Sequence, residues 1–383
     1  MAKISEFPDD LLIKILSFLP TKVAVSTSVL SKQWQFIWMW LPKLKFTNDY
    51  SNPIMLRDFI SKYLPLHRAP VIESLHLKCN CESTEPEDIK QWVGIAVSRC
   101  VRELSIYRSV FYNAVFLPSS LYTCKSLVTL ELDGNILVNV PQMVLLPCLK
   151  TCKLQRVIYS NEDSLRMLLS HCPALEDLTI SGIAGDNMGA LVVNVPSLKR
   201  SSLYKGKTCS SSDRNVIVTP SLKYFQVEDY RENVSYLIEH MPNREEADIC
   251  VWQDIDKFLE SMTSVKSLTL RVLRPVYLPV VVFNQLEHLT LHISNNYWSK
   301  LLVRLLKVSP ELRVLNLDVD KYGRYDEYQT VIWNNEQSSV PECLLKSLET
   351  FRFSGYERRE EERDFFSFFF QYACCLKYSS IFR

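Results

Sequence analysis

"LEHLTL", residues 286–291, has apolar side chains at its first, fourth and sixth positions and polar side chains between them. In an extended strand, alternate side chains point to opposite faces, so the last two leucines would share one face and the threonine would lie on the other. The same pattern, L-x-x-L-x-L, occurs eleven times in this chain of 383 residues. An internal repeat of this kind predicts one strand in each copy and a fold of stacked units.

The copies begin at residues 72, 101, 127, 149, 175, 198, 222, 265, 286, 312 and 348. Most steps between successive starts lie in or near the period of leucine-rich repeats. The longest step, from 222 to 265, has room for one more unit, and "ADICVWQ" (247–253) is a candidate for a degenerate twelfth strand.

Amphipathic patterns with helical spacing lie between several copies. They predict helices within residues 86–100, 161–172, 254–262 and 295–309. A strand and a helix cannot bury their own apolar faces, whereas stacked units can. The predicted fold is therefore α/β: a leucine-rich-repeat solenoid with a curved parallel sheet and helices on its convex side.

Strand alternation also predicts the concave face of the solenoid. Its outward positions carry mixed charge with some Tyr and His, whereas an RNA-binding surface would be a basic stripe with interleaved aromatic residues. We therefore expect a protein target, with plain solvation of each side chain as the alternative. The candidate target-binding residues are His76, Tyr107, Glu131, Lys153, Asp177, Tyr204, Glu228, Arg271, His292, Asp318 and Arg352.

The first forty residues follow a different pattern. "ISEFPDDLLIKILSFLP" (4–20) is apolar nearly all round, although it is too short to span a bilayer. The sequence predicts one helix over about 9–18, a second over about 22–29 and a third after Ser31. Three short helices have too little interior for so many apolar side chains. Either the following repeats or another protein must cover the surplus.

These residues resemble the F-box family. Phe7 to Leu12 match its Leu-Pro-x-x-Leu-Leu, Ile15 to Pro20 match its Ile-Leu-Ser-x-Leu-Pro, and Val29 to Trp34 match its Val-x-Ser-Lys-x-Trp, with Trp38 following. Phe7 replaces the usual Leu. Gln33 and Gln35 stand where plant members more often carry Arg, and we expect this change to remove positive charge at the rim of a partner contact.

The resemblance implies a substrate-recognition subunit of an SCF-type (Skp1–cullin–F-box) ubiquitin ligase, which docks a Skp1-like adaptor and through it the cullin, while the repeats hold an unknown target protein. A non-ligase scaffold, whose first helices pack on the solenoid, is the alternative. The residues expected at the adaptor are Phe7, Pro8, Leu12, Ile15, Leu16, Leu19, Leu30 and Trp34.

The C-terminal segment from Pro341 resembles the FBD domain of plant F-box/leucine-rich-repeat proteins. The similarity lies in the Pro-Glu-Cys-Leu at 341–344, the strand at 348–353, Gly355-Tyr356, an acid-rich run and a closing apolar helix. This helix would shield the open end of the last repeat. We expect an F-box at 1–48, the solenoid at 49–340 and an FBD-like αβ cap at 341–383.

The rest of the sequence carries no signal for an enzyme. It has no Gly-rich phosphate loop, no G-x-S-x-G elbow and no HExxH motif, and its net charge of +1 does not suit a nucleic-acid binder. His288 and His292 are four apart but lie on a predicted strand, so we expect neither a metal site nor a cofactor. The twelve Cys form no CxxC pair, the first residues lack the basic and apolar regions expected of a signal peptide, and the longest apolar runs are too short for a bilayer span. We expect a non-catalytic protein of the cytoplasm or nucleus that binds neither membrane nor nucleic acid.

Overall fold

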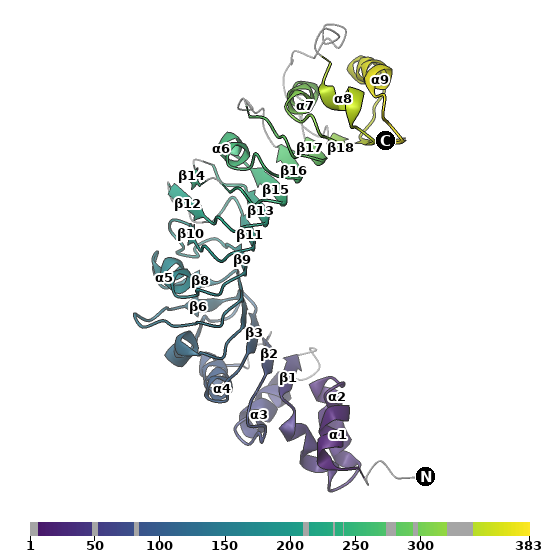
Figure 1. Ribbon diagram of the computed structural model, residues 1–383. Helices are drawn as coiled ribbons and strands as arrows, with labels where there is room; N and C mark the ends of the chain where they lie inside the picture. Colours follow the sequence, from purple (N-terminus) through teal and green to yellow (C-terminus); the bar gives the residue numbers. More distant parts are fainter. Residues whose placement is uncertain are drawn as a thin grey trace. The chain divides into compact units, whose positions relative to one another are not determined.

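The structure of the chain is a computed structural model, which describes residues 7–47, 53–79, 84–209, 214–232, 234–239, 241–272, 281–293, 298–319 and 340–383. The chain forms two compact units, Met1–Leu191 and Val192–Arg383 (Figure 1). The division between them falls inside the repeats. The predicted domain boundaries at 48 and 340 therefore stay predictions.

The first unit begins with short helices. They are α1 (Asp9–Leu16), α2 (Thr21–Ser26) and two 3₁₀ helices, η2 (Thr27–Val29) and η3 (Trp34–Trp40). Pro8 and Pro20 occupy the N-caps of α1 and α2, where the missing N–H costs nothing. The prediction of three helical segments is confirmed, although α1 ends two residues earlier than expected and the third segment is a 3₁₀ helix.

The main sheet of the first unit is parallel. Its strands, in spatial order, are β1 (Lys43–Thr47), β2 (Ser74–Cys79), β3 (Glu103–Arg108), β5 (Thr129–Gly134), β7 (Thr151–Gln155) and β9 (Asp177–Ser181). Each predicted copy supplies one strand, in register, so that Leu75, Leu104 and Leu130 form one buried row. The strand β1 was not predicted. The segment "LPKLKF" (41–46) has the repeat spacing but lies within the segment predicted as the F-box.

Helices and a second sheet cover one face of these strands (Figure 1). The helices are α3 (Pro53–Tyr63), α4 (Pro86–Ser98), η4 (Ser119–Thr123) and α5 (Ser164–Ser170). The predicted helices within 86–100 and 161–172 are confirmed as α4 and α5. Elsewhere the covering layer is the small parallel sheet β4 (Val115–Phe116), β6 (Ile136–Val138) and β8 (Ile158–Tyr159), which was not predicted. The uncovered face of the main strands is called the open face below.

The second unit repeats this organisation. Its main strands, in order, are β11 (Arg200–Lys205), β13 (Tyr224–Asp229), β15 (Glu246–Val251), β16 (Ser267–Val272), β17 (His288–Ile293), β18 (Val314–Val319), β19 (Thr350–Ser354) and β20 (Tyr378–Ile381). The candidate twelfth strand is confirmed as β15. A small sheet of β10 (Val192–Asn194), β12 (Arg214–Val218) and β14 (Ser235–Ile238) covers part of the other face.

The remaining helices of the second unit are α6 (Ile255–Glu260), α7 (Trp298–Lys307), α8 (Glu342–Lys346) and α9 (Glu360–Tyr372). The predicted closing helix is α9, and three glutamates form its first turn, as the helix dipole favours. The ring of Phe369 lies 4.2 Å from that of Phe351 on β19, and the Phe365 ring lies 5.3 Å from that of Trp298 on α7. The helix thus covers the apolar side of the last repeat.

The degenerate copy carries an unusual core residue. Backbone hydrogen bonds align Glu245 with Lys223, so Arg244 stands where the neighbouring copy has Leu222. The Arg244 guanidinium is buried over the ring of Phe225, 4.8 Å from its centroid, and its Nε and Nη1 make no hydrogen bond within the described part of the chain. Burial lowers the pKa of Arg244 to about 9. An unpaired buried cation destabilises the folded state.

We expect Arg244→Leu to raise the free energy of unfolding at pH 7 by about 1–4 kcal/mol, because leucine restores the repeat and removes a buried charge. Chemical denaturation would measure the change. The reverse exchange in the neighbouring copy, Leu222→Arg, is the control and should lower stability. A loss of stability in Arg244→Leu would contradict this account of the degenerate strand.

Candidate partner-binding surfaces

The residues predicted to meet the adaptor separate into two groups. Leu12 and Leu16 on α1 and Trp34 on η3 are at most 5% exposed, so they hold the N-terminal helices together. The sequence could not settle which candidates face a partner and which hold the helices together, so a binding role for these three stays a prediction. A helix that is apolar nearly all round must still direct one face into its own small core.

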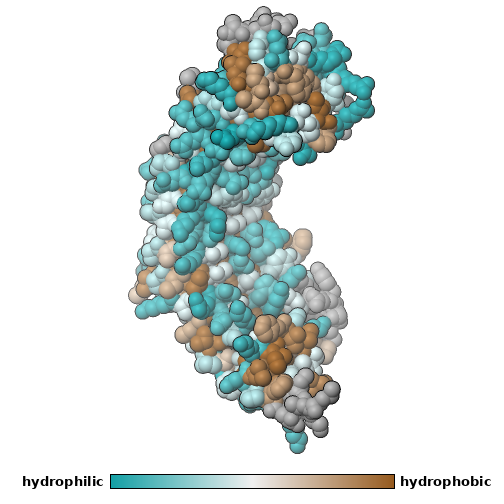
Figure 2. Space-filling model, turned by 45° about the vertical axis from the view of Figure 1, so that its right-hand side comes forward, coloured by the Kyte–Doolittle hydropathy of each residue, from teal (hydrophilic) through white to brown (hydrophobic). Residues whose placement is uncertain are grey.

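The other group lies at the surface. Pro8, Ile15, Leu19 and Leu30 are exposed, and Phe7 is half-buried. Further exposed apolar side chains on the same helices are Leu11, Phe18, Val23, Val29, Phe36 and Trp40. The largest exposed fractions are those of Val29 (86%) and Phe18 (80%), which the sequence-based list omitted. On the face shown in Figure 2, hydrophobic residues gather over these helices. Within the described part of the chain, the repeats therefore leave an apolar surface open there.

Gln33 has a different role from the one expected. Its Nε2 donates to the backbone oxygen of Phe7 at 3.1 Å and to Oδ1 of Asp9 at 2.9 Å. These bonds tie the segment before η3 to the start of α1. The glutamine therefore helps to position Phe7 and Pro8, and its effect on the charge of a partner contact stays a prediction.

The helices are joined to the first repeat by an aromatic cluster. The Trp38 ring is buried, and its centroid lies 5.3 Å from that of Phe59 and 5.9 Å from that of Tyr63, both on α3. Phe46 on β1 also contacts Phe59, at 6.4 Å. Because α3 lies outside the segment predicted as the F-box, the N-terminal core extends beyond residue 48.

Hydrogen bonds fix the same junction. The backbone oxygen of Met39 accepts from the N–H groups of Arg68 and Ala69 at 2.8 and 3.2 Å. The backbone N–H of Lys45 donates to the Thr21 hydroxyl at 2.8 Å, and the buried His67 ring lies with Nε2 2.9 Å from the oxygen of Leu41. Burial, with a contribution from Arg99, lowers the pKa of His67 to about 4.

The open face of the first unit contains the five candidates predicted on its strands. His76, Glu131 and Lys153 share one register row, Tyr107 lies in the next, and Asp177 lies one row away on the other side. All five are half-buried. Lys153 pairs with Glu131 at 2.7 Å. A similar pair, which the prediction omitted, joins Arg156 to Asp133.

The open face of the second unit holds the remaining candidates. Tyr204, Glu228, Arg271, His292 and Asp318 share one register row, and Arg352 lies in the adjacent one. His292 Nδ1 lies 3.1 Å from Asp318 Oδ2.

The Arg271 guanidinium joins three neighbouring strands. It contacts Glu228 and Asp248, each at 3.0 Å. Burial raises the pKa of Asp248, and Arg271 opposes this change. Asp248 was not among the candidates because it lies on the degenerate strand β15. The predicted open-face positions are therefore correct, whereas their binding role stays a prediction.

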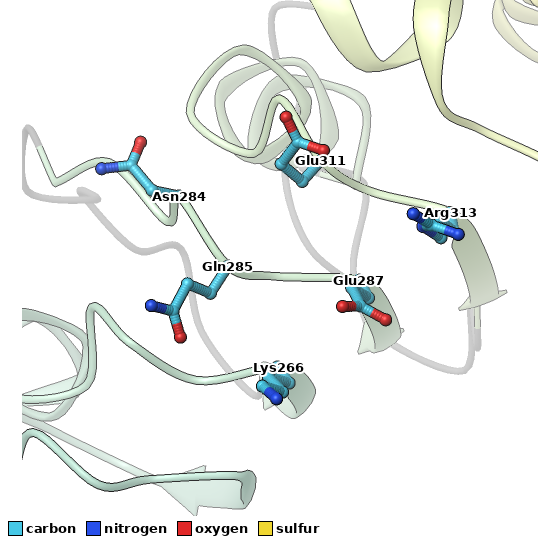
Figure 3. A pocket seen from close by; sticks show the side chains of 6 residues that line it. All are labelled: Lys266, Asn284, Gln285, Glu287, Glu311 and Arg313. Carbon is cyan, nitrogen blue, oxygen red and sulfur yellow. The ribbon is translucent and has the colours of Figure 1, made fainter.

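A polar hollow of about 320 Å³ lies at the starts of β16 to β18 (Figure 3). It is lined by Lys266, Asn284, Gln285, Glu287, Glu311 and Arg313. In Figure 3 the two amides and Glu311 project in different directions, so these groups do not converge on one point. Over the described ranges, no group of three or more His, Cys, Asp or Glu could hold a metal ion, and no helix has the length and apolarity to cross a membrane.

Three family models match the chain. The F-box domain model matches residues 4–46, a model described as leucine-rich repeats of the FBD-associated F-box protein At5g56370 matches residues 89–245, and the FBD model matches residues 335–381. These matches confirm the similarity read from the sequence and agree with the N-terminal helices, the repeated parallel strands and the C-terminal αβ region.

Relatives from Arabidopsis thaliana extend over the whole chain. FBD-associated F-box protein At5g60610 is 56% identical over 394 residues, covering 100% of both proteins. A protein with the same FBD-associated F-box designation, At5g56700, is 60% identical over 390 residues, covering 100% of this chain and 98% of its own. FBD-associated F-box protein At4g10400 is 49% identical over 387 residues, covering 100% of this chain and 92% of its own.

The low pKa of His67 predicts that acid loosens the junction. Unfolded His67 takes up a proton below about pH 6.5, whereas the folded chain resists until about pH 4, so stability falls as the pH drops through this window. Between pH 7.5 and 5, the free energy of unfolding of the wild type should fall by about 2 kcal/mol more than that of His67→Gln. Denaturation of both proteins at both pH values measures this. An equal loss of stability in the two proteins would contradict the low pKa of His67.

Proposed function

Because this chain belongs to the FBD-associated F-box proteins of plants, we propose that it is the substrate-recognition subunit of an SCF-type ubiquitin ligase. In this proposal the N-terminal helices dock a Skp1-like adaptor and through it a cullin, and the leucine-rich repeats bind a target protein. Proteins with F-box, repeat and FBD regions are generally non-catalytic adaptors, and we infer the same of this chain.

The observation that supports the proposal best is the apolar surface left open on α1, α2 and η2. Ile15 and Leu19 are each 37% exposed, and Phe18 and Leu30 are far more so. A soluble protein rarely leaves so many neighbouring apolar side chains in water without a partner. Covering them with another chain would remove their area from water at about 25 cal/mol per Å². An amphipathic helix laid in an apolar groove is a recurring form of such binding.

The mechanism we propose is proximity. Ubiquitin transfer would be catalysed by other subunits, and this chain would hold the target beside them at a high effective concentration. The Trp38 cluster and the hydrogen bonds at Met39 support this role, because they join the adaptor surface to the first repeat without a free linker. The open faces, polar and mixed in charge, suit a protein target.

We assign the protein to the cytoplasm or nucleus, without binding to membrane or nucleic acid. In support, no two of the cysteines that the structure describes form a disulfide, as expected in a reducing compartment. The rival is a scaffold that binds proteins through its repeats and recruits no ligase. Binding of the adaptor distinguishes the two.

We expect Ile15→Asp and Leu19→Asp each to weaken binding of a Skp1-like adaptor to the full chain about 30-fold or more, as for a central interface residue. Both side chains are partly exposed, so the fold should survive the change. Calorimetry with the purified adaptor would measure the affinity.

Leu145→Asp is the matched control. Leu145 is 47% exposed and belongs to the same unit, but it precedes β7 and lies outside the N-terminal helices. Its variant should bind the adaptor as the wild type does. If the folded wild type does not bind the adaptor, the scaffold alternative is favoured instead.

A further inference from the structure

Three lysines line the open face next to the N-terminal helices. Lys43 and Lys45 project from β1, and Lys78 projects from the neighbouring strand β2. All three are exposed. We call Lys43, Lys45 and Lys78 the lysine strip. It adjoins the proposed adaptor surface, because β1 begins three residues after η3 ends and Lys45 bonds to Thr21 of α2.

Two acids on this face already have cationic partners. Glu131 pairs with Lys153 at 2.7 Å, and Asp133 pairs with Arg156 at 2.7 Å. Glu103 shares a register row with Lys43 but lies two strands away, on β3. No ion pair involves Lys43, Lys45 or Lys78 among the residues that the structure describes. The positive charge of the strip is therefore not neutralised by this part of the chain.

Two neighbours show the effect of this charge. His76 lies beside Lys45 in the register, and its pKa is lowered by burial and then by Lys45 and Lys78, while Glu131 opposes this change. The Lys78 ammonium lies 5.6 Å from the ring centre of Tyr107, whose ring also faces Arg156 at 5.6 Å. Beyond the lysine strip, Lys78, Tyr107 and Arg156 thus form a cation–aromatic–cation arrangement along the same face.

We propose that the lysine strip docks an acidic, extended segment of the target protein. This deepens the proposed function, and it rests on that function only for calling the bound protein a target. Lys43 and Lys45 are two residues apart on one strand, a spacing of about 6.6 Å, which equals the spacing of alternate side chains in an extended peptide. Carboxylates at every second residue of such a segment can therefore meet both lysines.

The local charge favours a polypeptide over nucleic acid. On the next strands of the same face, Glu131 and Asp133 are paired, whereas Glu103 makes no ion pair among the described residues. These acids leave net negative charge in the path of a continuous phosphate backbone. A segment with a few carboxylates can contact the strip and avoid these acids. Long-range attraction would also speed the encounter and make binding sensitive to salt.

The test uses the full chain without an adaptor. A fluorescent peptide of about twelve residues, alternating Glu and Ser, is the probe, and peptides alternating Lys and Ser and a single-stranded oligothymidylate of equal length are the comparisons. Fluorescence anisotropy at low and high salt measures affinity. The variant is Lys43→Glu/Lys45→Glu/Lys78→Glu, and the control is Lys90→Glu/Lys125→Glu/Lys266→Glu, which changes the net charge equally at exposed lysines elsewhere.

We expect the acidic peptide to bind the wild type and the control alike, and to lose about tenfold or more in affinity for the strip variant. Equal losses in both variants would mean that only net charge matters and would overturn the proposal. So would thymidylate binding that is as tight as peptide binding and is lost with the strip. A melting curve checks that each variant folds. Binding of the adaptor is measured separately, so a failure of the ligase assignment is distinguishable from a failure of the strip.

Discussion

The structure depends on one constraint: no repeat can bury its own apolar face. Each main strand turns its leucines toward a layer of helix or short strand, and the parallel register stacks these side chains into continuous rows. Within each unit every copy is therefore stabilised by its neighbours. A polar or charged residue in such a row, such as Arg244, therefore destabilises the adjoining copies as well as its own.

Because of the same constraint, the first and last repeats need other elements to cover their apolar faces. At the C-terminal end, α9 places Phe365 and Phe369 against the rings of the last repeat. At the N-terminal end, Trp38 and the helices around it cover the first strand and α3. These helices in turn have no further element of the described chain over Phe18, Val29 and Leu30. The helices that cover the first repeat therefore leave apolar side chains of their own exposed, and we propose that a partner covers them.

Most of the fold was predicted from the spacing of apolar residues along the sequence. All eleven copies form strands, because three apolar residues at fixed positions define which face is buried. The small outer strands, such as β4 and β8, were missed because two-residue segments carry no periodicity. The candidate adaptor-binding residues could not be divided into buried and exposed ones, because the segment contains too many apolar residues. In α1 nearly every position is apolar, so spacing does not separate the buried Leu12 and Leu16 from the exposed Ile15 and Leu19. Only the packing of α1 against η3 decides this.

The central claim is that a second protein completes the burial of the N-terminal helices. Hydrogen exchange of the full chain, alone and with a Skp1-like adaptor, tests it most directly. The account predicts slower exchange across residues 9–40 in the presence of the adaptor, with little change in β3 to β9. Unchanged exchange over residues 9–40, or protection confined to the repeats, would contradict it.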